Sequence, residues 1–436
     1  MPTRLSLSSS NFLQEFECFL NIKRDSQASV EKVVTNILED IRLNGDEALF
    51  KYTSQFDMHQ LKSNNIRITS QETDQALLEC DQEQLKALKL AEKRIRAFHE
   101  KQLPSDLNYE DDIGVKLGLK WNPIDAVGIY IPGGLASYPS SVLMNSIPAK
   151  VAGVKRLAMV VPTPGGVINP LVLAAARISG VDEIYKVGGA QAIGALAYGC
   201  DSIKAVDKII GPGNSYVATA KRLVFGIVGI DMIAGPSEIL IVADNKNDPN
   251  WIAADLLAQA EHDINAQAIL LTDDNNFADQ VCEAIDIKLK ALSRGKIAGE
   301  SWHNFGAVII LKNLEQSTRL INRIAPEHLE LAIEEPNNIM NNSLNAGAVF
   351  LGRHTPEALG DYIGGPNHVL PTGRSARFSS GLGVLDFMKR TSFLDVSAQA
   401  IEAIGPAAVS LAEAEGLEAH AHSVKLRLSG LDGDPM

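Results

Sequence analysis

The chain has 436 residues, and at roughly 150 residues per domain it is long enough for about three folded units. Hydrophobic residues make up 45% and charged residues 21%, an ordinary globular composition that excludes an intrinsically disordered chain. The formal net charge of −13 argues against nucleic acid and anionic membrane as partners, because both bind cationic surfaces.

The cysteines and the apolar runs indicate the cellular compartment of the protein. Four cysteines stand singly, without CxxC spacing or the density of a secreted disulfide scaffold: Cys18, Cys80, Cys200 and Cys282. No apolar run reaches the ~18 residues that span a bilayer, and the first residues lack a charged start followed by an apolar stretch. We therefore expect a cytoplasmic protein.

The first long segment is helical in pattern. From about Ser29 to Glu100 the sequence is charged, poor in glycine and proline, and periodically apolar, as in VEKVVTNILEDIRLNGDEALFKYTSQF. This pattern predicts amphipathic helices that serve as scaffold.

Two stretches of alternating strand-like and helix-like runs follow. Between Trp121 and Asp231 the strand-like runs are DAVGIYI, RLAMVVP, DEIYKVG and DKIIG. After Glu238 they are EILIVAD, QAILLTDD, FGAVIIL and AGAVFLG, separated by helical segments such as NWIAADLLAQAEHD. Such alternation predicts an α/β fold with two Rossmann-like, incomplete dinucleotide-fold domains on buried, largely parallel sheets. The two halves share no visible sequence identity, so a duplication is only a hypothesis.

The last part of the chain differs again. From Arg353 to Thr391 it is rich in glycine, proline and serine, which predicts a long loop of the kind that is usually functional. Beyond it, SAQAIEAIGPAAVSLAEAEGLEAHAHSVKLRL predicts an extended helical C-terminal tail.

Candidate metal ligands gather in the C-terminal half. Gln259 and His262 are three residues apart in a predicted helix, so both project from one face and could bind one cation; a solvated polar face is the alternative. Asp361 and His368 lie in the glycine-rich loop, where a ligand can approach closely, although a loop aspartate also forms turns. Mixed imidazole and oxygen donors suit zinc or another borderline divalent metal.

Further candidates remain open on the sequence alone. His354 and His422 compete as metal ligands. The adjacent Glu327 and His328 can both move protons near neutral pH, although the same residues suit the charged first turn of a helix.

The signal for a cofactor is weaker, because no GxGxxG fingerprint follows a strand. Three glycine runs end a predicted strand and open a helix: YIPGG at 130–134, VGGAQAIG at 187–194 and GPGN at 211–214. Their exposed N–H groups favour phosphate, but a tight strand-to-helix turn is the better explanation of any one run.

Taken together, the strings in this sequence resemble the histidinol dehydrogenase family. They occur in the family's order and spacing: GIYIPGGLASYPSSVLMNSIPAKVAGV, VGGAQAIGALAYG, IIGPGN, IDMIAGPSEILIVAD, AQAEHD, APEHLEL, GDYIGGPNHVLPTGRSARFSSGL and AEGLEAH. Residues before about Lys120 match only loosely. The resemblance implies an NAD-dependent dehydrogenase that oxidises L-histidinol through L-histidinaldehyde to L-histidine with two NAD, the final steps of histidine biosynthesis.

The resemblance also implies roles for single residues. One zinc ion per subunit would be held by Gln259, His262, Asp361 and His420, with the substrate's imidazole and amino nitrogens completing the shell. The substrate would contact these four ligands and also Ser237, His328, His368 and Glu415. NAD would contact Tyr130, Gln191 and Asn214. His328 would be the base that takes the alcohol proton, and Glu327 would activate the water that attacks the aldehyde.

The same resemblance implies a domain plan and a partner. The expected parts are an N-terminal helical arm at 1–24, a catalytic, zinc-binding Rossmann-like domain at 25–125 and 238–380, an NAD-binding Rossmann-like domain at 126–237, and a dimerisation tail at 381–436. The partner is a second copy of the chain, because Glu415 and His420 of the tail would reach the other subunit's site in a homodimer with shared active sites.

Two other classes of protein use the same residues. A zinc hydrolase would use Glu327 to activate metal-bound water and would need no dinucleotide. A binding or structural protein would use the metal only to support its fold.

Overall fold

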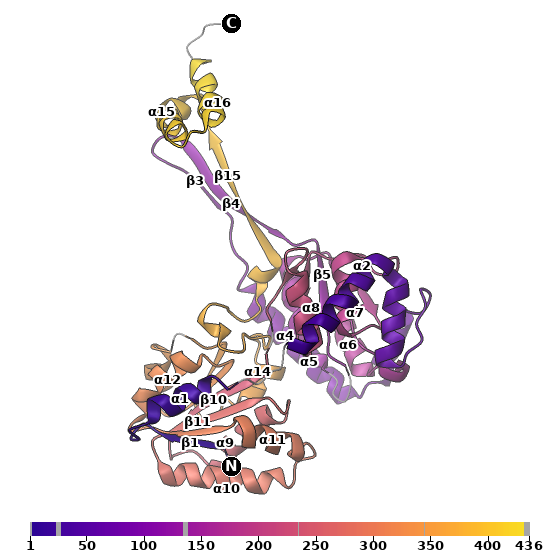
Figure 1. Cartoon of the computed structure of the whole chain (residues 1–436), viewed down its shortest axis with the longest axis vertical. Coiled ribbons are helices and arrows are strands. Elements are labelled where there is room, and N and C mark those ends of the chain that lie inside the picture. Colours follow the sequence, from indigo (N-terminus) through magenta and orange to yellow (C-terminus); the bar gives the residue numbers. More distant parts are fainter. Residues whose placement is uncertain (1, 23–27, 134–137, 234, 344, 431–436) are drawn as a thin grey trace. The chain divides into compact units, whose positions relative to one another are not determined.

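The computed structural model describes the whole chain except residues 1, 23–27, 134–137, 234, 344 and 431–436. Two compact units divide it: the first comprises Met1–Gln102 and Ile124–Phe387, and the second Leu103–Pro123 and Met388–Met436. Figure 1 traces the chain by colour through both units.

The first unit contains two six-stranded sheets, which we name sheet A and sheet B. Sheet A has the order β1 (Thr3–Ser6), β12 (Ala307–Ile310), β11 (Gln267–Thr272), β10 (Glu238–Ala243), β13 (His328–Ala332) and β14 (Ala348–Leu351), and every neighbouring pair is parallel. All residues of β10 and β11 are buried, as expected for near-continuous apolar runs in a parallel sheet covered on both faces.

Sheet B repeats the same order of strands. It runs β2 (Arg67–Ile68), β7 (Glu183–Tyr185), β6 (Arg156–Val160), β5 (Ala126–Tyr130), β8 (Lys208–Ile210) and β9 (Gly229–Ile230), parallel throughout except for the antiparallel edge strand β2. Without the edge strands β1 and β2, each sheet has its third, second, first, fourth and fifth strands in that order, as in a dinucleotide-binding fold that lacks its sixth strand. The prediction of two Rossmann-like halves is therefore confirmed.

Helices cover both faces of each sheet, and apolar cores fill the layers. Sheet A is flanked by α9 (Pro249–Ala260), α10 (Asn275–Leu289) and α11 (Gly295–Phe305) on one face, and by α1 (Phe12–Leu20), α12 (Ser317–Ile324) and α13 (Pro336–Met340) on the other. The short helix α14 (Glu357–Tyr362) follows β14. Around sheet B lie α2 (Ala28–Asp57), α7 (Gly189–Tyr198) and α8 (Ser215–Val224), together with α3 (Ser70–Glu79), α4 (Gln82–Glu100), α5 (Pro139–Ala152) and α6 (Pro170–Ser179).

The structure divides the chain differently from the expected domain plan. Residues 25–125 were expected with sheet A, but their helices pack on sheet B and their strand β2 joins it. The arm at 1–24 is not purely helical, because β1 extends sheet A before α1 begins. The loop expected from Arg353 to Thr391 contains α14 and the start of the long strand β15. Amphipathic helices show which face they bury but not which sheet they cover, so these differences were not readable from periodicity.

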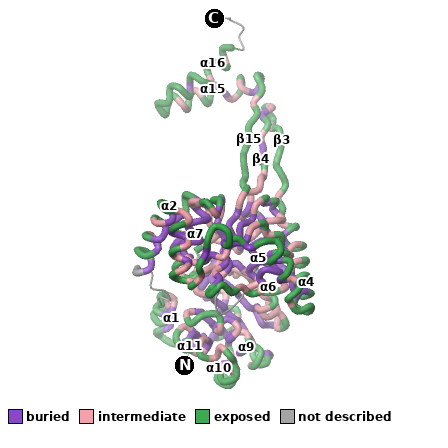
Figure 2. Tube along the Cα trace, turned by 90° about the vertical axis from the view of Figure 1, so that its right-hand side faces the viewer, coloured by how far each residue is buried: buried purple, intermediate pink, exposed green. Residues whose placement is uncertain are grey.

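The second unit is a three-stranded antiparallel sheet followed by two helices. The sheet has the order β15 (Met388–Val396), β4 (Val115–Pro123) and β3 (Leu107–Glu110), and the helices are α15 (Ala398–Ala414) and α16 (Glu418–Ser429). The helical tail was expected; the strands that precede it were not. Among its described residues only five are buried: Val115, Gly118, Ala400, Gly405 and Ala421. The exposed colour of its elements in Figure 2 shows how little core it has. None of the helices in the described part of the chain is long and apolar enough to cross a membrane.

A buried ion pair fixes the loop that follows β8. Gly211 has φ +106°, and a Cβ there would lie 2.1 Å from the carbonyl oxygen of Tyr130, so only glycine fits. Lys221 of α8 donates to the Gly211 carbonyl (2.9 Å), and the Asp231 carboxylate accepts from the Gly211 N–H (2.8 Å). Lys221 and Asp231 also pair with each other, with side chains only 2% and 1% exposed. Lys221 and Asp231 thus bind the carbonyl and the N–H of Gly211.

We expect Lys221→Met to lower the free energy of unfolding by about 3–5 kcal/mol, because it leaves Asp231 charged and buried without its partner. The double variant Lys221→Met/Asp231→Asn should lose less, since it removes both charges and keeps an acceptor for the Gly211 N–H. Urea denaturation of the three proteins measures the difference. Equal losses in the single and double variants would show that the ion pair does not fix this loop.

Candidate active site

The candidate site begins where β13 starts. Ala325 ends α12 in a left-handed conformation (φ 49°, ψ 61°), Pro326 follows, and the chain then enters β13 at His328. Glu327 and His328 therefore open a strand and not a helix. The parallel pairing of β13 with β10 aligns His328 with Ile239, which brings both acid and imidazole beside the first residue of β10.

The peptide groups of Glu238 hold both side chains. The Glu238 N–H donates to Oε2 of Glu327 at 2.9 Å, and Nδ1 of His328 lies 3.0 Å from the Glu238 carbonyl oxygen. A carbonyl oxygen only accepts, so Nδ1 carries the proton and Nε2 keeps its lone pair. This tautomer presents Nε2 as the basic atom.

The surroundings of Nε2 keep His328 neutral. Nε2 has no hydrogen-bond partner among the described residues, and it lies 3.6 Å from Oε1 of Glu357 and 3.9 Å from Oδ1 of Asp361. Burial lowers the pKa of His328 to about 4, although the charge of Asp361 acts in the opposite direction. At neutral pH the imidazole is an uncharged base next to two carboxyl groups.

Helix α14 and the loop after it supply the next group of side chains. Burial, the charge of Asp361 and hydrogen bonding with Asp361 raise the pKa of Glu357 to about 10. Nδ1 of His368 lies 3.0 Å from the Asp361 carbonyl oxygen, and Nε2 lies 3.4 Å from Oγ of Ser141 on α5. Burial also lowers the pKa of His368. Both imidazoles of the cluster are thus oriented by carbonyl oxygens and neutral.

Helix α9 brings two more candidate ligands to the cluster. Gln259 is 1% exposed, and neither atom of its amide has a partner among the described residues. His262, just past the end of α9, is exposed, and its charge contributes to lowering the pKa values of His328 and His368. The charge effect of His262 places this end of α9 near His328 and His368, and the metal-binding role of Gln259 and His262 stays a prediction.

The cluster can hold a metal. Ligand atoms of His328, Glu357 and Asp361 all lie within 4.8 Å of one another. With Gln259 and His262 nearby, the donors are nitrogen and oxygen, the set that suits zinc. Only Asp361 is common to this triad and to the four ligands expected from the sequence. The unpartnered amide of Gln259 is an independent sign that an occupant belongs here, because buried polar atoms are normally hydrogen-bonded.

The residues expected to contact NAD lie at the carboxyl ends of the strands of sheet B. Ligands of parallel α/β sheets bind beyond the carboxyl ends of the strands where the order reverses, here between β5 and β8. Tyr130 ends β5; its ring is buried, and its hydroxyl accepts from the Gly189 N–H at 3.1 Å. Gln191 is 1% exposed, and neither amide atom has a partner in the described part of the chain. Asn214 caps α8 by accepting from two backbone N–H groups at 3.1 Å.

A model of the histidinol dehydrogenase family matches residues 20–428. The chain belongs to the histidinol dehydrogenase family. Histidinol dehydrogenase from Rhizobium meliloti is 58% identical over 429 residues, covering 98% of this chain and 99% of that protein. The Ruegeria pomeroyi histidinol dehydrogenase is 57% identical over 433 residues, covering 99% and 100%. The crystal structure of histidinol dehydrogenase from Elizabethkingia anophelis matches with a TM-score of 0.94 at 39% identity, covering 99% of both chains.

The residues expected from the resemblance to histidinol dehydrogenases fall into three places. The first group surrounds the amino ends of β10 and β13 and consists of Ser237, Gln259, His262, Glu327, His328, Asp361 and His368. Of these, Ser237 directly precedes β10. The second lies at the carboxyl edge of sheet B: Tyr130, Gln191 and Asn214. The third belongs to the second unit, where Glu415 caps α15 and His420 lies in α16.

The competing histidines lie elsewhere. His354 follows the carboxyl end of β14, opposite to the edge where β13 begins, and its ring packs on Trp251 with centroids 5.5 Å apart. His422 lies in α16, two residues after His420. Gly134, the last residue of the YIPGG run, lies outside the described residues.

Sequence reasoning missed Glu357. The segment EALGD places Glu357 and Asp361 four residues apart on one helical turn, a spacing that puts both side chains on one face. The surrounding glycines and prolines predict a loop, and they mask this helical spacing.

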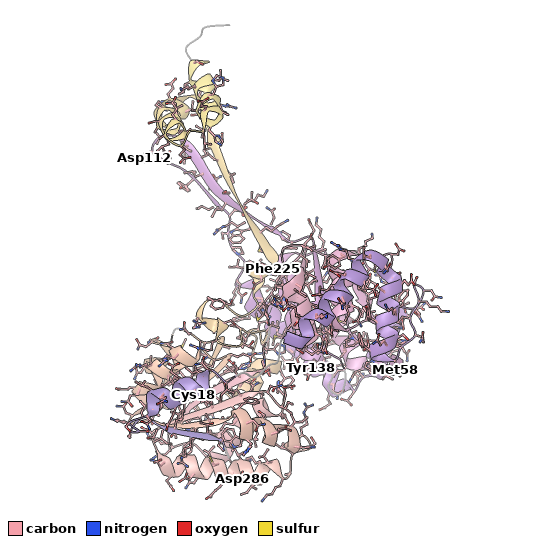
Figure 3. All side chains as sticks on the ribbon, in the orientation of Figure 1. Cys18, Met58, Asp112, Tyr138, Phe225 and Asp286 are labelled. Carbon is pink, nitrogen blue, oxygen red and sulfur yellow. The ribbon has the colours of Figure 1, made fainter. Side chains whose placement is uncertain are left out.

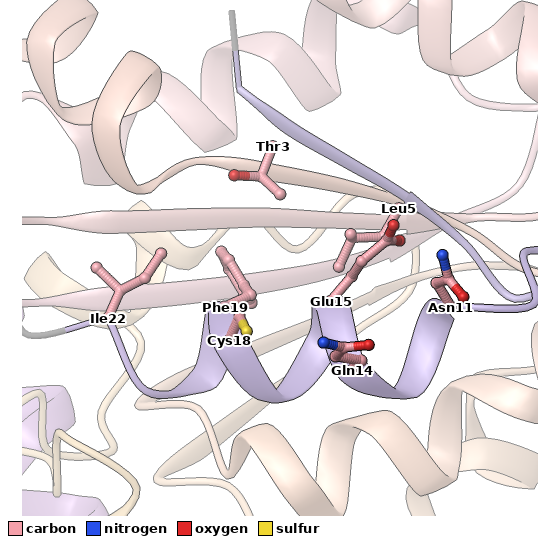
Figure 4. A pocket seen from close by; sticks show the side chains of 8 residues that line it. All are labelled: Thr3, Leu5, Asn11, Gln14, Glu15, Cys18, Phe19 and Ile22. Carbon is pink, nitrogen blue, oxygen red and sulfur yellow. The ribbon is translucent and has the colours of Figure 1, made fainter.

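One surface hollow has no part in this chemistry. It has a volume of about 500 Å³ and lies between β1 and α1 (Figure 4). Its lining contains Glu15 and Cys18 as titratable groups, and no histidine.

Proposed function

We propose that this protein oxidises L-histidinol to L-histidine in two successive steps, with water and two NAD as co-reactants. The observation that carries the proposal is the neutral, buried imidazole of His328, whose free Nε2 faces Glu357 and Asp361. The relatives named above, all histidinol dehydrogenases, support the choice of substrate.

Two bound groups complete the chemistry. When bound, zinc would orient the substrate through its imidazole and amino nitrogens, and NAD would accept one hydride in each step. Gln259, His262, Asp361 and His420 would hold the zinc ion. Glu357, kept as a neutral acid by burial and by Asp361, would hydrogen-bond to the Asp361 carboxylate and orient it.

The protein's own groups move the protons. In the first step, Nε2 of His328 takes the hydroxyl proton while hydride leaves the same carbon, which gives the aldehyde. In the second step, Glu327 takes a proton from water as its oxygen adds to the aldehyde, and the hydrate then loses hydride to become the carboxylate. The sum consumes one water and two NAD and releases three protons. His328 suits this role because it is uncharged at neutral pH.

The second unit supports a homodimer as the working form. Its described residues leave large apolar side chains exposed, among them Tyr109 at 50%, Leu394 at 62% and Leu411 at 66%. A unit with so small a core is not expected to be stable alone, so we infer that a second copy covers it. Glu415 and His420 would then serve the site of the partner subunit. A cytoplasmic location stays a prediction.

The proposed function predicts that histidinol plus NAD gives two reduced nicotinamides per histidinol, followed by absorbance. A chelator should abolish the signal and zinc should restore it. Asp361→Ala and His262→Ala should lose bound zinc together with turnover, by more than the roughly 10–100-fold typical of outer-shell partners. His354→Ala, a histidine at the opposite edge of sheet A, is the matched control and should keep both. No reduction of NAD would favour the hydrolase alternative, and unfolding by the chelator would favour a structural metal.

Glu327→Gln should separate the two steps. Its side-chain oxygen can still accept the Glu238 N–H, so the local geometry should survive while the base is lost. We expect aldehyde oxidation to slow by about 10²–10⁴-fold and alcohol oxidation to change much less. Single-turnover kinetics started from histidinol and from histidinaldehyde measure the two steps. Equal losses in both would rule out this division of roles.

Subunit mixing tests the shared site. His328→Ala and His420→Ala are each expected to be nearly inactive. In a shared-site dimer, each mixed dimer gathers both defects in one site and leaves the other intact, so random exchange should restore about a quarter of wild-type activity. If each site lies within one subunit, no activity returns, even when mass spectrometry shows that subunits have exchanged.

A further inference from the structure

The carboxyl edge of sheet B lacks an acid that dinucleotide-binding folds normally provide. In such folds an Asp or Glu near the end of the second strand accepts a hydrogen bond from the adenosine ribose. Here the second strand is β6, and the residues that follow it, VPTPGG at 161–166, contain no carboxylate. An acceptor for the ribose would have to come from another part of the chain.

The segment that follows α2 is bound to the loop after β6. His59 reaches the loop after β6, where its Nδ1 lies 2.8 Å from Oγ1 of Thr163. Met58, labelled in Figure 3, has φ +52°, an unfavourable conformation for a residue with a long side chain. Such strained residues persist where the surrounding structure holds them, and they concentrate at functional sites. The strained turn directly follows Asp57, the last residue of α2.

The Asp57 carboxylate has an unused acceptor. Its Oδ2 is buried and has no hydrogen-bond partner among the described residues. Burial raises the pKa of Asp57, and no cation contributes to its shift. Burial also raises the pKa of Tyr130 to about 12, and the nearby charge of Asp57 adds to that shift. Asp57 therefore lies in the surroundings of the Tyr130 hydroxyl.

Other unpartnered groups lie in the same region. The Tyr130 hydroxyl binds the N–H of Gly189, and Gln191 stands two residues further along α7 with both amide atoms unpartnered in the described part of the chain. Helix α2, which carries Asp57, packs on α7. The one lysine whose charge acts on His59, Lys186, is already bound to Glu72 at 2.9 Å. Within the described residues no lysine contributes to the electrostatic surroundings of Asp57.

We propose that Asp57 binds the 2′-hydroxyl of the adenosine ribose of NAD and thereby selects NAD over its 2′-phosphorylated form. The inference rests on the proposed function, because it takes NAD as the cofactor. A carboxylate accepts the ribose O–H as a charge-assisted hydrogen bond. The same carboxylate repels a 2′-phosphate, which has no proton to donate at neutral pH and carries like charge. Asp57 thus takes the place of the missing acid after β6.

The test compares three probes on the full-length, zinc-loaded protein by calorimetry: NAD, NADP, and an NAD analogue without the adenosine 2′-hydroxyl. Wild-type protein should bind the deoxy analogue roughly 10- to 100-fold more weakly than NAD, the range for a hydrogen bond to a charged group. In Asp57→Asn this penalty should shrink to a few-fold, and the preference for NAD over NADP should fall with it. Affinity for histidinol should stay unchanged.

Asp46→Asn is the matched control. Asp46 is another carboxylate of α2, but its partners lie within the protein: it accepts from Oγ of Ser202 at 2.5 Å and from the Ser202 N–H at 3.1 Å. This variant should lower the melting temperature and keep the wild-type ratio between NAD and the deoxy analogue. General damage to α2 is thereby separated from loss of the ribose contact.

Two results overturn the inference. If the wild type binds NAD and the deoxy analogue equally, or if Asp57→Asn keeps the full penalty, Asp57 does not bind this hydroxyl. The wild-type comparison needs no variant, so it decides even if Asp57→Asn does not fold. If the wild type binds none of the probes, the proposed function fails as well, and that outcome is distinct from the other two.

Discussion

The candidate site depends on the pairing of β10 with β13. That pairing sets one residue, Glu238, beside Glu327 and His328, and the backbone of Glu238 binds both side chains. Backbone groups in a buried parallel sheet cannot rotate away as side chains can, so the acid and the imidazole are held without help from a ligand. The bond to Nδ1 also determines which nitrogen is basic. The arrangement of strands thus determines the tautomer of the imidazole.

The two sheets have the same strand order but present their candidate residues at opposite edges. In sheet A the residues lie at the amino ends of β10 and β13, whereas sheet B uses the carboxyl ends at its point of reversal. The loop after α14 also contacts α5: Ser141 lies 3.4 Å from His368, and Asn367 donates to the Met144 carbonyl at 2.6 Å. Helix α5, which follows β5, therefore contacts the loop that carries His368, a candidate substrate-binding residue. Strand order alone would have predicted the carboxyl edge in both halves.

The sequence predicted what depends on local pattern. EILIVAD and QAILLTDD were readable as strands because a strand buried on both faces must be continuously apolar. The partner of the helices at 28–100 was not readable, because an amphipathic face fits either sheet. Asp57 gave no signal, since its importance comes from burial and from the absence of a partner, which only the folded structure reveals. Gln259 and His262 have a spacing that also suits a solvated face, so their proposed roles came from the family resemblance.

The groups without partners share a physical consequence. Gln259, Gln191, Asp57 and Nε2 of His328 each have a buried polar atom without a partner among the described residues, and such an atom costs about 1–3 kcal/mol when neither water nor a ligand satisfies it. A folded chain keeps such atoms when something that binds only the folded state satisfies them. These atoms lie in two places, around the start of β13 and around the end of β5. The unpaired polar atoms are thus concentrated where substrate and cofactor are proposed to bind. Binding at either place would therefore stabilise the fold as well as complete the site, and the unliganded protein should be the less stable form.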